Sequence, residues 1–371
     1  MSDRFFVGTR KGLFRFEKSN GSWKQANESF LGIQVPMLLP DPRDGTFYAA
    51  VEHGHFGTKL HRSGDGGDSW DELDAPKYPE KPDDAPEVLD PHRQVPVPWS
   101  LEKIWSLEGA GTDQPGSLWC GTIPGGLFRS EDRGESWTLN RPLWDQPDRA
   151  RWTGGGYDFP GIHSICVHPE DSKRVSLGIS CGGVWNTTDG GQSWEQGAHG
   201  MIYDFMIGEE GADDPASQDP HRMVQCATSP EHFWVQHHCS IYRSSDEARS
   251  WQEILGVSPS GFGFAVAVHP EDPDTAWVVP AKKDEARYPI DGKFIVNRTR
   301  DGGNSFDPLT RGLPSPPAYD IVYRHALEVD DTGEVLAMGS TTGGLWISEN
   351  GGDSWTEITA HLPPVYVVRF G

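Results

Sequence analysis

The stretch Ser63-Gly64-Asp65-Gly66-Gly67-Asp68-Ser69-Trp70 follows the pattern Ser/Thr-x-Asp-x-Gly-x-x-Trp, called here a box. Five further boxes begin at Ser130, Thr187, Ser244, Thr299 and Ser348. The aspartate of such a pattern accepts hydrogen bonds from backbone amides in a tight turn, and the glycine adopts the positive φ that the turn requires. The recurring residues therefore indicate a structural repeat, and we expect no single box aspartate to serve as an acid or a metal ligand.

The boxes vary in ways that leave the repeat readable. Ala248 stands at the glycine position of the fourth box, Phe306 closes the fifth, and Asn350 replaces the aspartate of the sixth. A worn copy near the start retains Asn20, Gly21 and Trp23. The closing aromatic residues then number seven: Trp23, Trp70, Trp137, Trp194, Trp251, Phe306 and Trp355.

Repeats that recur every few tens of residues, as these boxes do, are typical of β-propellers, in which each unit buries its faces on its neighbours. The 44 glycines, 30 prolines and 15 tryptophans suit many short strands joined by turns. The sequence therefore predicts an all-β fold in which residues 1–371 form a single seven-bladed propeller domain.

Strand-like segments on both sides of each box make it the turn between the third and fourth strands of a blade. Counting back from the boxes places the innermost strands near Met37, Lys103, His163, Met223, Phe264, His325 and Val365. The chain begins on a second strand, residues 4–9, and ends on a first strand, residues 365–370. We therefore expect these two segments to pair and close the ring, which removes exposed sheet edges.

The charge and the cysteine content of the chain bear on which partners it binds and where it is located. The formal net charge of −23 argues against nucleic acid and anionic membranes. No apolar run is long enough to cross a membrane, and the first residues do not resemble a signal peptide. The five cysteines are odd in number and lie in strand-like runs, so we expect reduced thiols in a cytoplasmic protein.

The long insertions all fall on one face of the predicted propeller. In an up-and-down blade, the links between blades lie opposite the box turns, together with the links between second and third strands. The insertions occupy these links, at residues 71–102, 140–162, 195–222, 282–292 and 307–324. Insertions that gather on one face of a repeat protein usually mark its working face.

Polar residues gather at the same predicted mouth. We expect one funnel in which Glu102, Glu285 and His163 are candidates for catalysis. Substrate-binding candidates are Lys103, Arg287, Arg324, Arg10 and His325. A divalent metal is a further possibility, with His53, His55, His221 and His237 as ligands and Asp219, Glu102 or Glu285 as an added carboxylate. Because His237 and His238 are adjacent, only one of them should face the channel.

The boxes resemble those of BNR-repeat, sialidase-like propellers over the whole chain. The segments 53–57, 98–105 and 284–289 are similar to a bacterial family of cytosolic BNR-repeat proteins labelled glycosyl hydrolase or exo-α-sialidase. The resemblance implies a propeller fold and a glycosyl-hydrolase-like activity. A sialidase also carries three arginines for the substrate carboxylate and a Phe/Tyr-Arg-Ile-Pro segment. Here the corresponding start contains Arg10 without the Ile-Pro.

Three functions remain open from the sequence. The first is a hydrolase or lyase acting on a small polar molecule or glycan through a His/Glu/Arg mouth. The second is a non-catalytic propeller whose rim grips a sugar or a protein, and the third is a strict sialidase. The clustered histidines and acids favour the first, whereas three converging arginines would favour the third.

Overall fold

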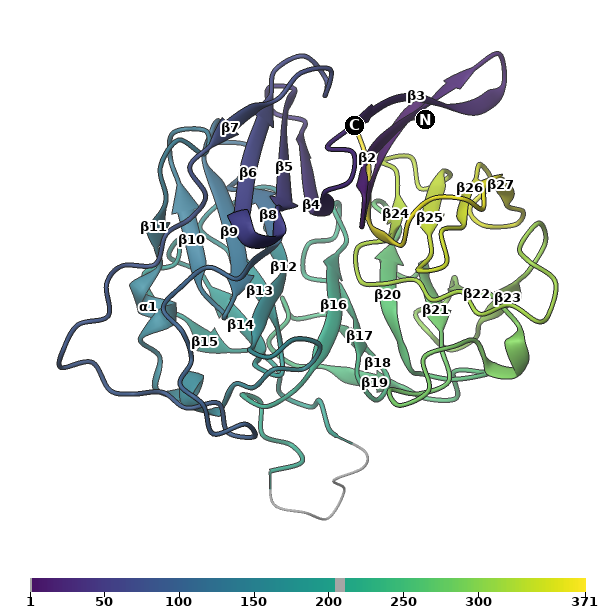
Figure 1. Cartoon of the computed structure of the whole chain (residues 1–371). Helices are drawn as coiled ribbons and strands as arrows, with labels where there is room; N and C mark the ends of the chain where they lie inside the picture. The colour runs from purple at the N-terminus through teal and green to yellow at the C-terminus, as the bar shows by residue number, and fades with distance from the viewer. Residues whose placement is uncertain (1, 204–210) are drawn as a thin grey trace.

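The computed structural model describes residues 2–203 and 211–371, and these form a ring of seven four-stranded antiparallel sheets (Figure 1). The first three blades, from the innermost strand outward, have the following strands: β28 (Val365–Phe370), β1 (Arg4–Thr9), β2 (Gly12–Ser19), β3 (Ser22–Ser29); β4 (Gln34–Asp41), β5 (Thr46–Glu52), β6 (Thr58–Ser63), β7 (Asp71–Leu73); β8 (Lys103–Gly109), β9 (Leu118–Ile123), β10 (Leu127–Ser130), β11 (Thr138–Leu139).

The other four blades repeat this order. Their strands are β12 (Gly161–Val167), β13 (Val175–Ser180), β14 (Gly183–Thr187), β15 (Glu195–Gln196); β16 (Pro220–Gln225), β17 (Phe233–His237), β18 (Ile241–Ser244), β19 (Gln252–Ile254); β20 (Gly263–Val268), β21 (Ala276–Pro280), β22 (Val296–Thr299), β23 (Asp307–Leu309); β24 (Leu327–Val329), β25 (Leu336–Gly339), β26 (Leu345–Ser348), β27 (Thr356–Thr359). The helical segments described are short: α1 (Arg141–Trp144), η1 (Gly54–Phe56), η2 (Pro147–Arg151) and η4 (Ile290–Gly292). None of the helices in the described chain has the length and apolar character to cross a membrane.

The two ends of the chain close the ring as the sequence predicts. Strand β28 pairs antiparallel with β1, with Phe5 opposite Phe370 and Thr9 opposite Val365. The predicted fold, including seven blades and closure by the C-terminal strand, is confirmed.

Each box is a turn held by its own side chains. In the first box, Asp65 Oδ1 accepts hydrogen bonds from the amide of Ser69 at 2.9 Å and from Ser63 Oγ at 2.7 Å. Ser63 Oγ also accepts from the amide of Gly67 at 2.9 Å. Ala248, at the glycine position of the fourth box, adopts a φ of 58°, so the left-handed turn persists without glycine there.

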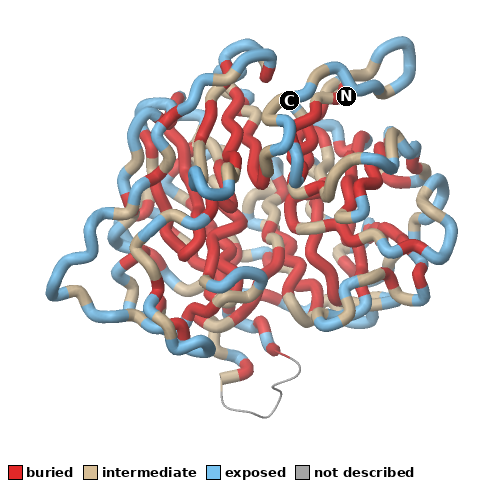
Figure 2. Tube along the Cα trace, in the orientation of Figure 1, coloured by how far each residue is buried: buried red, intermediate tan, exposed pale blue. Residues whose placement is uncertain are grey.

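The box tryptophans also join neighbouring blades. Trp194 donates from Nε1 to Asn140 Oδ1 at 3.0 Å, just beyond β11 of the preceding blade. Trp251 likewise donates to the carbonyl of Gly197, just beyond β15, at 2.7 Å. The buried residues follow the strands of the ring, whereas the outer loops are exposed (Figure 2). The core therefore consists of interfaces between blades, and it fixes the inner strands around a central channel.

Candidate functional site

A small cavity of about 120 Å³ opens where the inner strands begin, at the end of the channel opposite the boxes. It is called here the mouth. Its lining residues come from inner strands, links between blades and the insertion 282–292: Pro36, Lys103, Trp105, Gly156, Tyr157, Arg287, Tyr323, Arg324, His325 and Tyr366. Of the predicted substrate-binding residues, Lys103, Arg287, Arg324 and His325 therefore share one cavity. The exposed Arg10 is not among its lining residues.

Arg324 is the unusual cation of the mouth. Its side chain sits on aromatic rings, with Cζ 4.8 Å from the Trp105 centroid and 5.5 Å from that of Phe264. The residue is 8% exposed, and its buried Nε has no hydrogen-bond partner. No described residue forms a hydrogen bond or ion pair with this guanidinium. Burial lowers its pKa, against the opposing charge of Asp219. A buried arginine without a partner is costly, so this position favours an anionic ligand.

The other two cations of the mouth have carboxylate partners. Lys103 Nζ forms an ion pair with Glu52, and Arg287 forms one with Asp284. Lys103 Nζ also lies 5.0 Å from the ring centroid of Tyr157. These pairs neutralise the rim and leave Arg324 as the unmatched charge among the lining residues that the structure describes.

Aromatic side chains form the wall beside Arg324. The Trp105 and Tyr157 rings meet edge to face with centroids 5.0 Å apart, and Tyr157 is 47% exposed. Tyr366 donates from its hydroxyl to Gln34 Oε1 at 3.1 Å. A half-exposed tyrosine beside a buried tryptophan presents an apolar face with polar tips, which is the surface that stacks against a sugar ring.

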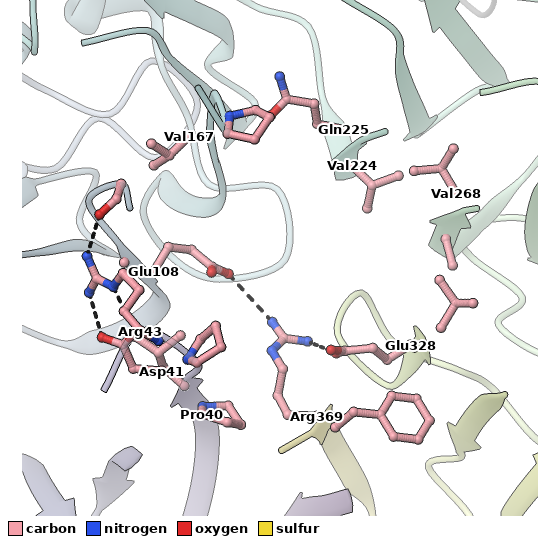
Figure 3. Close-up of a pocket in the computed structure, with 18 of the residues that line it drawn as sticks. Pro40, Asp41, Arg43, Glu108, Val167, Val224, Gln225, Val268, Glu328 and Arg369 are labelled. Carbon is pink, nitrogen blue, oxygen red and sulfur yellow. Dashed lines mark hydrogen bonds and ion pairs between the residues drawn. The ribbon is translucent and has the colours of Figure 1, made fainter. Parts of the chain in front are cut away.

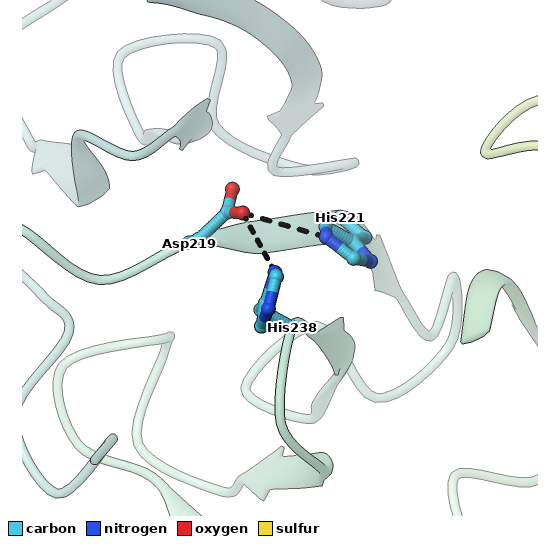
Figure 4. Close-up of side chains that lie close together, drawn as sticks. All are labelled: Asp219, His221 and His238. Atoms are coloured by element: carbon cyan, nitrogen blue, oxygen red, sulfur yellow. Dashed lines mark ion pairs between the residues drawn. The ribbon is translucent and has the colours of Figure 1, made fainter. Parts of the chain in front are cut away.

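Asp219, His221 and His238 form a cluster (Figure 4). The His221 ring stacks on Phe264, the ring that Arg324 also lies over. Asp219 Oδ2 is 3.4 Å from His221 Nε2 and 3.3 Å from His238 Nδ1. The other carboxylate oxygen, Oδ1, accepts hydrogen bonds from Ser180 Oγ at 3.1 Å and from the amide of Cys181 at 3.0 Å. These two donors aim Oδ2 at the histidines.

The electrostatics of the cluster keep the carboxylate ionised. Burial acts to raise the pKa of Asp219, but the charge of His221 and the hydrogen bonds of both histidines hold it well below its usual range. Burial lowers the pKa of His221, against the charge of Asp219. Burial has the same effect on His238, but there the hydrogen bond and charge of Asp219 outweigh it and raise the pKa.

Two glycines bring the mouth and the cluster together. A Cβ on Gly155 would lie 2.5 Å from Ser180 Oγ and 3.2 Å from Asp219 Oδ1, so only glycine allows this approach. A Cβ on Gly156 would lie 3.7 Å from Arg324 Nη2. Residues 155–156 therefore lie between Asp219 and Arg324, and no motif in the sequence marks these two glycines.

The structure brings only one of the four predicted metal ligands into the cluster. His53 precedes the short turn η1, and His55 lies within it. The nearby charged or titratable residues that His53 influences are His61 and Glu72, which are outside the cluster. His237 is fully buried, and its ring contacts the backbone amides of Asp219 and Cys239. Burial lowers the pKa of His237 to about 3. Only His221 of the predicted four belongs to the cluster, which His238 and Asp219 complete.

The predicted catalytic residues do not line the mouth cavity. Glu102 is exposed, and burial of its carboxyl together with the charge of Asp158 raises its pKa. Glu285 is exposed and lies 3.2 Å from Lys283 Nζ. His163 is completely buried beneath Trp105, where its Nε2 is 2.7 Å from the carbonyl of Pro220. The structure therefore does not bring the three together in one funnel, because the two glutamates are exposed and His163 is in the core.

A larger cavity, of about 440 Å³, opens at the box end of the channel (Figure 3). There Arg369 lies 2.6 Å from Glu328 and 3.9 Å from Glu108, and Arg43 pairs with Asp41. Burial raises the pKa of both glutamates, whereas it lowers that of the nearby Arg222. The charges of Arg222 and Arg369 balance those of Glu108 and Glu328 at the centre of this cavity. We therefore interpret it as a structural part of the channel, and the mouth as the candidate site.

Comparisons with known proteins support the fold and a distant relationship. No protein-family model matches the chain. It is 25% identical over 284 residues to a probable oligoxyloglucan-reducing end-specific xyloglucanase of Neosartorya fischeri, which is 70% of this chain and 32% of that protein. The corresponding xyloglucanase of Emericella nidulans is 24% identical over 282 residues, 68% and 32% of the two chains. The chain spans about a third of the length of these curated relatives.

Solved structures give the same architecture. The GH74 xyloglucanase from Xanthomonas campestris superposes with a TM-score of 0.64 at 17% identity, covering 98% of this chain and 52% of that one. The chain is a β-propeller distantly similar to GH74 xyloglucanases. A structure described as YCF48 bound to D1 peptide also superposes, with a TM-score of 0.51 at 15% identity over 93% of this chain and 86% of that one. Identities this low establish the shared fold alone.

Proposed function

We propose that the chain is a glycosyl-hydrolase-like propeller that acts on glycans, and that its mouth binds a sugar bearing a carboxylate. Arg324 is the observation that carries this proposal. Its guanidinium is buried and stacked on Trp105, and it forms no ion pair or hydrogen bond with a described residue, although the charge of Asp219 acts on it. A carboxylate can accept two parallel hydrogen bonds from a guanidinium, which supplies the missing partner.

The walls of the mouth support a sugar as the rest of the ligand. The half-exposed Tyr157, held by the buried Trp105, offers an aromatic surface for stacking, and the tyrosine hydroxyls offer hydrogen bonds. The similarity to proteins named xyloglucanases supports the glycan class. The five free cysteines agree with the cytoplasmic location that we retain as part of the proposal.

The bond-breaking chemistry is either hydrolysis or elimination. Glycoside hydrolysis usually needs two carboxyl groups that flank the scissile bond. The lining residues of the mouth include no Asp or Glu within the described chain, so an acid would have to come from its border. Glu102, whose pKa is raised, is such a border residue, and we keep it as a candidate general acid. Asp219 stays ionised, so it could serve there only as a carboxylate.

Binding without turnover is the second candidate function. The absence of a carboxylate pair from the described mouth lining favours it, as does the pairing of Lys103 and Arg287 with acids. A strict sialidase is less well supported, since two arginines and a lysine line the described cavity where three arginines would be required.

The decisive experiment compares ligands that differ in a carboxylate. Calorimetric titration with glucuronate and with glucose should show binding of glucuronate only. Arg324→Met should weaken that binding at least tenfold, roughly the loss of one charge-assisted contact. Arg141→Ala is the matched control, because Arg141 is an exposed arginine already paired with Asp145 on a link between blades. Equal affinity for both sugars, or unchanged binding by Arg324→Met, would contradict the proposal.

Turnover is tested separately from binding. Oligosaccharides containing uronic acids are incubated with the protein, and chromatography detects shortened or unsaturated products. Products that disappear in Arg324→Met would support the enzyme, whereas saturable binding without products would establish the binding propeller.

A further inference from the structure

Asp219, His221 and His238 bring two imidazoles and one carboxylate to a single point (Figure 4). One possible ligand atom from each residue lies within 4.8 Å of those of the other two. Asp219 and His221 are each about 2% exposed, whereas the His238 side chain is 23% exposed. The cluster is thus buried on two sides, with its third member nearer the surface.

The separations within the cluster are long for hydrogen bonds between charged groups and match those between ligands of one metal ion. Charge-assisted N–H···O bonds are about 2.7–2.9 Å long, shorter than the 3.3 and 3.4 Å measured here. Zinc binds imidazole nitrogen and carboxylate oxygen at about 2.0–2.2 Å in tetrahedral geometry, which places neighbouring ligand atoms about 3.3–3.6 Å apart. Both separations from Asp219 Oδ2 fall in this range.

The surrounding hydrogen bonds orient the ligands as a metal site requires. His221 Nδ1 lies 2.6 Å from the carbonyl of Gly263 and donates its hydrogen there. In the neutral ring this leaves the lone pair of Nε2 facing Asp219 Oδ2, an arrangement that a metal ion between the two atoms would stabilise. Ser180 and Cys181 hold the other oxygen of Asp219, so the carboxylate is fixed in the same direction.

We infer that Asp219, His221 and His238 form a binding site for one divalent transition-metal ion, with zinc as the favoured ion. Two nitrogens and one oxygen suit zinc and its first-row neighbours better than calcium or magnesium, which prefer oxygen ligands. Three protein ligands leave a fourth position for an oxygen atom of a ligand or of water.

The site lies beside the mouth, since residues 155–156 lie between Asp219 and Arg324. A bound ion would polarise an oxygen of the sugar held there, and this catalytic role rests on the proposed function. Metal binding itself does not, because it needs only the three side chains of the cluster.

The test begins with the whole protein stripped by EDTA and dialysed. Titration with ZnCl₂ and elemental analysis after desalting should give one zinc per chain, and bound Co²⁺ should absorb visible light as a low-symmetry complex. His238→Gln and Asp219→Asn should each weaken zinc binding by at least about tenfold. His361→Ala, which removes an exposed histidine of another link, should bind as the unmodified protein does.

Near-ultraviolet circular dichroism establishes that each variant is folded. Absence of stoichiometric zinc in the unmodified protein would overturn the inference, as would unchanged affinity in folded His238→Gln. Arg324→Met separates the two proposals, since it should retain zinc while losing glucuronate. Zinc binding without glucuronate binding would refute only the proposed function, and glucuronate binding without zinc binding would refute only the metal site.

Discussion

At the scale of the residue, the shape of the mouth depends on two glycines, because a side chain at either position would occupy space beside the site. Gly155 and Gly156 are adjacent in sequence but differ in the space around them. A Cβ on Gly155 would meet Ser180 Oγ at 2.5 Å and Cys181 Sγ at 2.8 Å, whereas one on Gly156 would meet only Arg324 nitrogens beyond 3.6 Å. The first glycine sets the distance between the link and the Asp219 cluster.

This contrast predicts different effects for two otherwise identical substitutions. Gly155→Ala should lower the free energy of unfolding by about 1–3 kcal/mol through overpacking, and it should also weaken ligand binding at the mouth. Gly156→Ala should change stability by less than about 0.5 kcal/mol. Urea denaturation of both variants provides the measurement, and equal stabilities would show that the close approach at Gly155 does not constrain the link.

At the scale of the element, the box turns explain why a degenerate motif still specifies a blade. Asp189 accepts from the amides of Gln192 and Ser193, both at 2.9 Å, and from Thr187 Oγ1 at 2.7 Å. Asn350 keeps the equivalent bond from the amide of Ser354 at 2.9 Å and donates from Nδ2 to Ser354 Oγ. The oxygen at this position matters more than its charge.

Two substitutions in one box test this interpretation. Asp189→Ala removes every acceptor and should lower the free energy of unfolding by about 1–3 kcal/mol. Asp189→Asn should lose clearly less, because it reproduces the arrangement at Asn350. Neither should alter binding at the mouth, which lies at the opposite end of the blades. Loss of ligand binding in a fully stable Asp189→Ala protein would mean that the working face had been assigned to the wrong end.

The sequence predicts the blades more fully than it predicts the residues of the site. Glycine and aspartate at fixed offsets determine a turn locally, so Ser63 to Trp70 and its repeats were enough to predict the blades and their order. Topology likewise brought Lys103 and Arg324 to one mouth. Of the predicted metal ligands, the structure places only His221 in a cluster of possible ligands. The prediction relied on strand alternation, whereas β5 ends at Glu52 before His53, and β17 ends at His237 before His238. Adjacent His237 and His238 do differ in burial, as expected, but the one beyond the strand reaches Asp219.

At the scale of the whole molecule, the boxes couple folding to pH. Hydrogen bonds from box side chains lower the pKa of Asp65, Asp132, Asp301 and Asp189, the last to about 2, and they do so for Asp246 against the effect of its burial. A carboxyl group whose pKa is lower in the folded state stabilises the fold above its unfolded pKa of about 4, and this stabilisation is lost as the pH falls.

We therefore expect the free energy of unfolding to decrease as the pH is lowered from about 4 to about 2. Asp189→Asn should show a shallower decrease over this window, because one of the coupled groups no longer titrates. Denaturant titrations at a series of pH values measure both slopes. Parallel curves for the two proteins would show that Asp189 has the same pKa in the folded and unfolded chains.

The central claim places ligand binding at the mouth, with Arg324 as the anchor for a carboxylate. A crystal structure of the protein soaked with glucuronate tests it most directly, because the box-end cavity is larger and also contains arginines. We predict density for the sugar against the exposed part of Tyr157, with its carboxylate on the Arg324 guanidinium. Sugar bound beside Arg222 and Arg369 at the box end, with the mouth unchanged, would contradict the claim.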